Sequence, residues 1–125
     1  MTFGETARLE PSAGVRLQVE LEIPPAPAPV RITLAGELDG EEVPRLDAAV
    51  AGVPLAGDPR DLRVDAGELT FLDSAGIRAL LVLRERATDS GARVVIDRVT
   101  ANVYRVLEIS GLLDVFGVGD RAGAD

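Results

Sequence analysis

The residues best placed to do chemistry are Asp73 and Ser74, which stand where an apolar, strand-like run ends and a helix-like pattern begins. Both side chains carry an oxygen that can accept a hydrogen bond from the unpaired N–H groups in the first turn of a helix. The same position is electropositive, because the positive end of the helix dipole lies there. A serine hydroxyl at such a point is either a plain helix cap or a site where a phosphate is tolerated and recognised.

The residue types that the chain lacks exclude most enzymatic mechanisms. The 125 residues contain no His and no Cys, and every basic residue is Arg, so that Lys is absent too. A nucleophile activated by His, a Schiff base and a lysine phosphate loop therefore cannot be built from these side chains. A structural zinc site would lack its usual ligands, and no motif points to a carboxylate magnesium site. We predict that the protein is not an enzyme and binds no metal or cofactor.

Composition and charge indicate the class of partner. The formal net charge is −8, and aromatic residues make up 3 % of the chain. A nucleic-acid-binding protein needs a basic surface and aromatic side chains for stacking, so the composition argues against that class. The negative charge favours a partner with a basic face. No apolar run approaches the roughly 20 residues of a membrane span, and no secretory signal is visible, so we expect a cytoplasmic protein that does not insert into a membrane.

Hydrophobic periodicity predicts the strands. Residues 15–23 alternate between apolar and polar types, as a half-buried strand does, and the alternation resumes at 30–34. Between them, the proline-rich run 24–29 is expected to form a stiff, polyproline-like connector that joins two antiparallel strands. Further strands are predicted at 62–64 leading to 71–72, at 92–96, and briefly at 112–116.

Helical spacing of apolar residues predicts three helices between these strands. The first has the acidic residues Glu41 and Glu42 in its first turn, which suits the helix dipole. The second covers about 75–87 and ends at a glycine, Gly91. The third is capped by Thr100 and also ends at a glycine.

The order of these elements predicts an α/β fold with one mixed sheet. Strands joined through a helix pair in parallel by right-handed crossovers, whereas the first strand, which has a short connector, is antiparallel. The sheet is therefore mostly parallel and is packed by three to four helices. We expect residues 15–116 to form a single domain, residues 1–14 to be a flexible N-terminus and residues 117–125 to be a disordered tail.

Three segments carry recognisable motifs in order along the chain. They are Phe-Leu-Asp-Ser-Ala-Gly-Ile at 71–77, Leu-Ala-Gly-Glu-Leu-Asp at 34–39, and the helix pattern at 103–112 that closes on Ser-Gly-Leu. These segments resemble the motifs of the STAS domain, the family of bacterial anti-sigma-factor antagonists. The resemblance covers roughly residues 15–116 and implies a STAS-like mixed sheet.

The resemblance also implies a function and a set of site residues. The serine after the motif aspartate is the phosphoacceptor in this family, and it corresponds to Ser74. The unphosphorylated form binds an anti-sigma factor, which is also a serine kinase of the histidine-kinase-like ATPase fold, and so frees a sigma factor. Phosphorylation stops this binding, and a serine phosphatase restores it. The implied partner surface contains Asp39, Asp73, Ser74, Gly76 and Ile77.

One departure from the family pattern keeps a second function open. Ala75 stands where many phosphorylated members carry Ser or Thr. The Asp-(Ser/Thr)-Ala-Gly pattern also occurs in STAS subunits of lipid-transport ABC systems, where the domain stabilises an ATPase without a clear phosphorylation switch. Simpler roles also remain open, in which Ser74, Asp73 or Asp39 is a helix cap and Gly76 allows a close helix approach. The protein is expected to be a monomer when alone.

Overall fold

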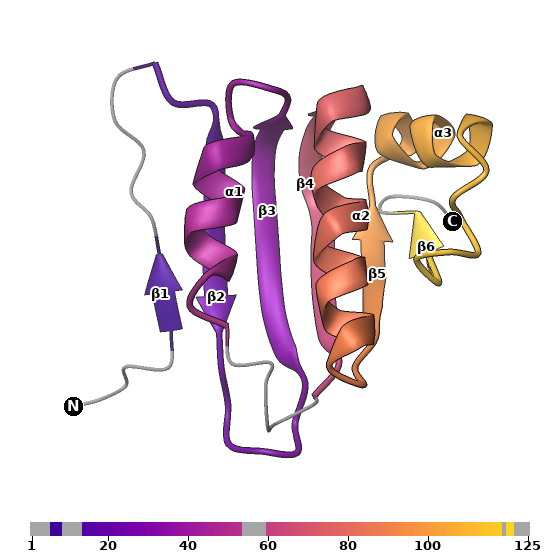
Figure 1. Cartoon of the computed structure of the whole chain (residues 1–125). Coiled ribbons are helices and arrows are strands. Elements are labelled where there is room, and N and C mark those ends of the chain that lie inside the picture. The colour runs from indigo at the N-terminus through magenta and orange to yellow at the C-terminus, as the bar shows by residue number, and fades with distance from the viewer. Residues whose placement is uncertain (1–5, 9–13, 54–59, 119, 122–125) are drawn as a thin grey trace.

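The sheet of this protein has six strands in the order β1-β2-β3-β4-β5-β6, and three helices pack on it. The structure is a computed structural model and describes residues 6–8, 14–53, 60–118 and 120–121 (Figure 1). The strands are β1 (Thr6–Arg8), β2 (Leu17–Glu22), β3 (Val30–Leu38), β4 (Leu62–Leu72), β5 (Val94–Val99) and β6 (Asp120–Arg121). The helices are α1 (Val43–Val50), α2 (Ser74–Asp89) and α3 (Ala101–Ile109).

Strands that are joined without a helix between them pair antiparallel, and strands that are joined through a helix pair in parallel. β2 pairs antiparallel with both β1 and β3, whereas β3, β4, β5 and β6 pair in parallel. The antiparallel pairing of β2 with β3 confirms the prediction from the short connector. The mixed, mostly parallel sheet is confirmed as well, and it places the carboxyl ends of β3 and β4 side by side at one edge.

The connector between β2 and β3 is a tight turn, so the prediction of an extended polyproline-like segment was wrong. The N–H of Ala28 donates to the carbonyl of Pro25 at 3.2 Å, and the peptide between Ala26 and Pro27 is cis. The guanidinium of Arg60 donates to the carbonyls of Pro24 and Ala28. These contacts fold the segment back on itself because a distant cation binds its carbonyl oxygens, which the local sequence does not reveal.

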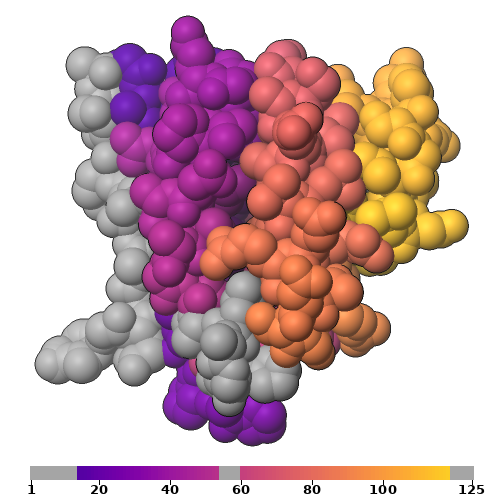
Figure 2. All heavy atoms as spheres, viewed as in Figure 1, coloured from indigo at the N-terminus to yellow at the C-terminus, as the bar shows by residue number. Residues whose placement is uncertain are grey.

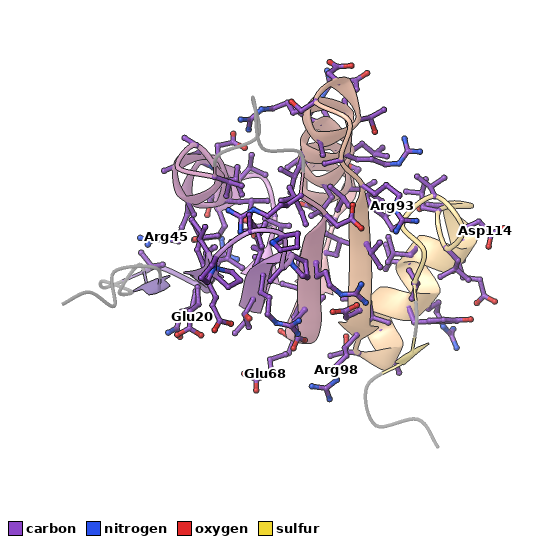
Figure 3. All side chains as sticks on the ribbon, turned by 90° about the horizontal axis from the view of Figure 1, so that it is seen from below. Glu20, Arg45, Glu68, Arg93, Arg98 and Asp114 are labelled. Atoms are coloured by element: carbon purple, nitrogen blue, oxygen red, sulfur yellow. The ribbon has the colours of Figure 1, made fainter. Side chains whose placement is uncertain are left out.

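The helices α1 and α2 cover one face of the sheet (Figure 1). On β3, the alternate residues Val30, Ile32 and Leu34 are fully buried under this layer, as a strand period of two requires. The opposite face of the sheet carries polar side chains, and Glu20, Glu68 and Arg98 point away from α1 and α2 (Figure 3). The core therefore lies between the sheet and the helices, and it reaches the edge of the sheet where β3 and β4 end.

Two predicted boundaries shifted in the structure. Glu41 and Glu42 precede α1 and are not part of its first turn, since Glu42 is the N-cap and Pro44 follows it inside the helix. The strands β3 and β4 are longer than predicted, because the polar residues after Leu34 and Val64 continue the parallel ladder across local register shifts. These extensions bring both strands to the same edge as the predicted site.

The predicted strand at 112–116 is wrong. Residues 113–117 form turns, with Val118 N–H donating to the carbonyl of Leu113 at 3.0 Å. Their apolar character comes instead from packing, since Phe116 is fully buried in the core. A parallel strand beside β5 is present, but it lies later in the chain at Asp120–Arg121, within the tail expected to be disordered.

The predicted N-terminal segment also contains regular structure. Thr6–Arg8 form β1 and pair with β2, although flexibility was expected for residues 1–14. The remaining expectations for residues 1–5, 9–13, 119 and 122–125 lie outside the described residues. The helix boundaries near Gly91, Thr100 and Gly111 are confirmed, because both glycines have positive φ and the Thr100 hydroxyl accepts from the N–H of Val103.

Candidate functional site

Asp73 is the residue that caps helix α2. Its backbone is extended, and its carboxylate accepts a hydrogen bond from the N–H of Gly76 at 2.9 Å. Its own N–H donates to the carbonyl of Leu38 at 3.4 Å, which links the start of α2 to the end of β3. The sequence suggested Asp73 and Ser74 as alternative caps, and the structure assigns the cap to Asp73.

Ser74 is the first residue of α2 and its side chain is exposed. Among the described residues, its hydroxyl makes no hydrogen bond to another group. The hydroxyl therefore stands in solvent at the electropositive end of a 16-residue helix. An exposed hydroxyl without a structural role is open to modification, and a phosphate placed there would meet the favourable end of the helix dipole.

Gly76 is buried and allows α2 to approach the end of β3. A Cβ at this position would lie 2.5 Å from the carbonyl oxygen of Leu38 and 2.7 Å from a methyl of Leu72. No larger residue fits without moving the helix, which confirms the packing role predicted for this glycine. Ile77, the next residue, is half-buried and packs against the core.

Asp39 organises the turn that joins β3 to α1. Its Oδ1 accepts hydrogen bonds from the N–H groups of Glu41 and Glu42, at 3.0 and 3.1 Å. Its carbonyl oxygen accepts from the N–H groups of Glu42 and Val43, both at 3.0 Å. Asp39 therefore serves as the cap of this turn, the structural role that the sequence left open beside a partner contact.

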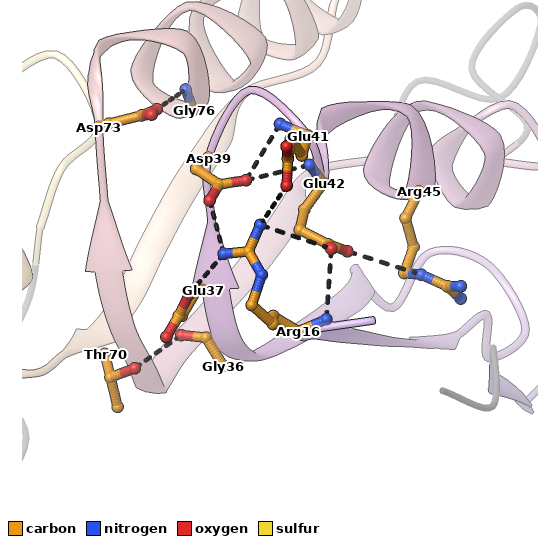
Figure 4. A network of polar contacts seen from close by, with 10 residues as sticks. All are labelled: Arg16, Gly36, Glu37, Asp39, Glu41, Glu42, Arg45, Thr70, Asp73 and Gly76. Atoms are coloured by element: carbon orange, nitrogen blue, oxygen red, sulfur yellow. Dashed lines mark hydrogen bonds and ion pairs between the residues drawn. The ribbon is translucent and has the colours of Figure 1, made fainter. Parts of the chain in front are cut away.

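Arg16 binds the carboxylates of the same turn (Figure 4). Its guanidinium donates to Glu37 at 2.5 Å, to Asp39 at 2.6 Å and to Glu41 at 2.9 Å. Its backbone N–H donates to the carboxylate of Glu42 at 3.2 Å. These five residues are called the Arg16 cluster below. Arg45 also lies 3.9 Å from the carboxylate of Glu42, so two cations face four carboxylates and the charge beside the start of α2 stays negative.

The contacts in the Arg16 cluster shift the pKa values of Arg16 and Asp39. The hydrogen bond from Arg16 lowers the pKa of the Asp39 carboxyl, and the N–H groups of Glu42 and Glu41 add to this effect. The hydrogen bonds to Asp39 and Glu37 raise the pKa of Arg16. Both shifts favour the charged forms, because each charge has an opposite charge within hydrogen-bond distance.

A glycine makes the attachment of Arg16 to the turn possible. Gly36 has a φ of +106°, and a Cβ there would lie 2.0 Å from the carbonyl oxygen of Arg16. That carbonyl accepts a hydrogen bond from the N–H of Glu37 at 2.9 Å. The hydroxyl of Thr70 in β4 donates to the carbonyl of Gly36 at 3.0 Å. The turn after β3 is therefore held from both neighbouring strands.

The structure gathers the predicted site residues at one edge of the sheet. Asp39 follows β3, and Asp73 follows β4, the parallel neighbour of β3. Ser74 and Ile77 lie in the first turn of α2, which contacts the end of β3 through Gly76. Asp39 and Ser74, which are 35 positions apart in the chain, therefore lie at the same edge of the sheet.

Sequence analysis missed Arg16. It stands at a polar position in an alternating segment, where an arginine is usually a solvated surface residue. One signal was available, since four acidic residues fall within 37–42 and such a density of like charge calls for a cation nearby. The sequence alone does not show which of the 13 basic residues supplies it.

In the described part of the chain, no group of three or more His, Cys, Asp or Glu side chains has the arrangement to hold a metal ion. The carboxylates of the Arg16 cluster are already bound to a guanidinium. In the same residues, no helix is both long and apolar enough to cross a membrane.

The chain is similar to known proteins in sequence. The family model described as "Mlab, STAS domain" matches residues 22–117. The anti-sigma-B factor antagonist of Bacillus subtilis (strain 168) is 24 % identical over 93 residues, which cover 74 % of this chain and 84 % of that protein.

The chain is also similar to solved structures in fold. An anti-sigma factor antagonist from Mycobacterium paratuberculosis gives a TM-score of 0.69 at 21 % identity, covering 86 % of this chain and 89 % of that one. The anti-sigma factor antagonist SpoIIAA in its unphosphorylated form gives a TM-score of 0.64 at 23 % identity, covering 82 % and 86 %. At these identities the likeness shows the fold, and it confirms the mixed sheet expected from the three motifs.

Proposed function

This chain belongs to the STAS domain family, and from that premise we propose that it is an anti-sigma-factor antagonist switched by phosphorylation at Ser74. The unphosphorylated form binds an anti-sigma factor that is also a serine kinase of the histidine-kinase-like ATPase fold, and so frees a sigma factor. Phosphorylation of Ser74 stops the binding, and a serine phosphatase restores it. The relatives described as anti-sigma-factor antagonists support this function.

The proposal rests on which side chain caps the start of α2. Asp73 supplies the cap that the helix needs, which leaves the exposed hydroxyl of Ser74 without a structural role. A cap hydroxyl would have to break its hydrogen bond before modification, whereas this one does not. The protein is the substrate of the kinase and the phosphatase, which supply the catalytic groups, and it acts as a cytoplasmic monomer.

Electrostatics explains how the switch works without refolding. A phosphate on Ser74 adds about −1.5 to −2 charges beside Asp73 and near the negative Arg16 cluster. The end of the helix dipole offsets part of this charge, so the fold survives. One extra charge at about 4 Å from a like charge costs roughly 1 kcal/mol in water and about 4 kcal/mol near a protein surface. Each 1.4 kcal/mol is about tenfold in affinity, so a loss of about 10- to 1,000-fold is expected when the docked partner places an acidic group at this point.

The test is phosphorylation of the full chain by each histidine-kinase-like anti-sigma factor encoded in the same genome. Intact mass and site mapping should show one added phosphate on the wild type and none on Ser74→Ala. Ser110→Ala is the matched control, because Ser110 is also an exposed serine at a helix end but lies at the C-terminus of α3. It should be phosphorylated like the wild type. Phosphate that persists in Ser74→Ala contradicts the assignment.

A second function is favoured by the description of the matching family model, which reads Mlab. In this function the domain is a STAS subunit that stabilises a partner ATPase, as in lipid-transport ABC systems, and no phosphorylation switch operates. The Asp-Ser-Ala-Gly sequence at 73–76 fits both functions and does not separate them. Tight binding to an ATPase with no phosphate transferred to Ser74 would select this function over the first.

A further inference from the structure

Arg78 lies one helical turn after Ser74 and has no partner in the unmodified chain. Its side chain is exposed, and among the described residues it makes no hydrogen bond and no ion pair. Other arginines near this edge are bound, since Arg16 pairs with Asp39 and Arg45 lies 3.9 Å from Glu42. The guanidinium of Arg78 is therefore available to a new anion.

The neighbours of Arg78 on α2 include no acidic residue. A helix places residues three and four positions apart side by side on its surface. For Arg78 these are positions 74, 75, 81 and 82, which carry Ser, Ala, Leu and Val. Ser74 is the only one of the four with a polar side chain. A phosphate on Ser74 would therefore be the only negative charge among these four neighbours.

The geometry of the helix directs the side chain of Arg78 toward Ser74. Every Cα–Cβ bond in a helix tilts toward the N-terminus, so a long side chain at position 78 covers the turn that contains Ser74. The order of the two residues is also favourable, because an ion pair at i and i+4 is stronger when the anion is the N-terminal member. Both features favour a contact between a phosphate on Ser74 and Arg78.

The tertiary structure leaves room for this contact. A groove of about 290 Å³ lies between α1 and α2 (Figure 2), and Arg78 lines its α2 wall together with Ala75 and Val82. Ala75, the residue next to Ser74, contributes only a methyl group to this wall. Asp47 lies on the α1 wall, and within the described part of the chain it forms no ion pair with Arg78. The arginine can therefore reorient along the open wall without breaking a bond.

We propose that Arg78 binds the phosphate of phosphorylated Ser74, an inference that rests on the proposed function because it needs a phosphate at this position. The planar guanidinium donates two parallel hydrogen bonds to phosphate oxygens, a geometry that arginine favours. Arg78 thereby stabilises the phosphorylated form, which does not bind the anti-sigma factor, and leaves the stability of the unphosphorylated form unchanged. It is the phosphate-binding residue of the switch.

The charge state of the phosphate reports this contact. A phosphoserine has a second pKa of about 6, and a neighbouring guanidinium lowers that pKa because it favours the dianion. The other charged groups that face this point are Asp73 on α2, the Arg16 cluster in the turn after β3, and Arg45 and Asp47 on α1. They are the same in every variant of Arg78, so a difference between variants isolates the effect of Arg78.

The test is a phosphorus-31 NMR titration of the full chain with phosphoserine incorporated at position 74 by amber suppression, which needs no kinase. Arg78→Gln should raise the phosphate pKa by about 0.2–0.4, the shift that an ion pair at i and i+4 implies. Arg84→Gln is the matched control, because Arg84 is also an exposed arginine of α2 but lies about 15 Å from Ser74 along the helix axis. It should titrate like the wild type.

A measurement on the unphosphorylated chain separates the phosphate contact from a structural role. Arg78 has no partner there among the described residues, so Arg78→Gln and the wild type should have equal urea midpoints. With phosphoserine at position 74, Arg78→Gln should unfold at a lower urea concentration than the wild type. The same loss of stability in both forms would overturn the assignment, because Arg78 would then support the fold and not the phosphate.

The outcomes distinguish this inference from the proposed function. Equal phosphate pKa values in the wild type and Arg78→Gln overturn the contact and leave the proposed function intact. An equal rise in Arg78→Gln and Arg84→Gln also overturns it, because the net charge of the chain then sets the pKa. If no histidine-kinase-like anti-sigma factor phosphorylates Ser74, the proposed function fails, and the regulatory role of Arg78 fails with it even where the titration detects the ion pair.

Discussion

At Gly76, where α2 contacts β3, helix propensity and tertiary packing predict opposite effects of Gly76→Ala on stability. Alanine is more favourable than glycine in a helix by about 1 kcal/mol, so helix propensity alone predicts that Gly76→Ala is stabilising. The structure predicts the reverse. The added Cβ would lie 2.5 Å from the carbonyl oxygen of Leu38, 2.7 Å from a Leu72 methyl and 3.0 Å from the Leu38 Cγ. The oxygen belongs to the backbone of β3, so it cannot rotate away and the helix has to move.

The magnitude follows from the cost of overpacking. Inserting a methyl group into a tightly packed position costs about 1–3 kcal/mol. Because the added methyl meets backbone that cannot rotate away, the cost falls in the upper part of this range, about 2–3 kcal/mol, and the gain of about 1 kcal/mol in helix propensity leaves a net loss of about 1–2 kcal/mol in the free energy of unfolding. For a domain of this size, each kcal/mol lowers Tm by roughly 4 °C, so a decrease of about 4–8 °C is expected. The hydrogen bond from Asp73 N–H to Leu38, already 3.4 Å long, should weaken further.

The assay is urea and thermal unfolding followed by far-UV circular dichroism. Gly40→Ala is the matched control, because Gly40 lies in the neighbouring turn, and a Cβ there would meet nothing closer than the Ala75 Cβ at 3.6 Å. Its φ is not positive, so alanine is tolerated and reduces the entropy of the unfolded chain. A urea midpoint of Gly76→Ala equal to or above that of the wild type would refute the packing argument, whatever the result for Gly40→Ala.

Two further predictions concern the same edge of the sheet. Arg16→Gln should lower stability at neutral pH. Arg16 lowers the pKa of Asp39, so its contribution to stability is full above the ordinary value of 3.8 and is lost as the pH falls through the lowered pKa. The urea midpoints of variant and wild type should therefore converge as the pH is taken below 3.8. Asp73→Ala should cost about 1 kcal/mol through loss of the cap, and Asp73→Asn much less, because asparagine also caps well. Equal unfolding midpoints for the two Asp73 variants would argue against the cap.

Local patterns in the sequence predicted the elements that depend on local interactions. The alternation at 15–23 predicted β2, and the apolar spacing after Asp73 predicted α2, because burial on one face imposes the period of the element. The cap at Thr100 was predicted correctly for the same reason, since a cap joins residues only three positions apart. The failure at 112–116 has the opposite cause: an apolar run is compatible with a strand or with a turn that buries Phe116, and only packing distinguishes them.

The candidate site was also predicted only in part from the sequence. The pattern at 71–77 placed Asp73 and Ser74 at the start of a helix, and the resemblance to the family implied that Asp39 lies near them. The groove between α1 and α2 was not predicted, because its walls come from two helices whose distance depends on the packing of both on the sheet.

The sequence by itself determined the strands β2 to β5, the three helices, the family motifs and the position of the serine, since these depend on periodicity and on contacts between residues close in the chain. Only the tertiary structure decided that Asp73 caps α2 while Ser74 stays exposed, and that Arg16 binds the turn after β3. Arg16 and Asp39 are 23 positions apart and meet because β2 pairs antiparallel with β3. The physical reason is that hydrogen bonds and ion pairs between distant segments form only after the sheet has brought those segments together.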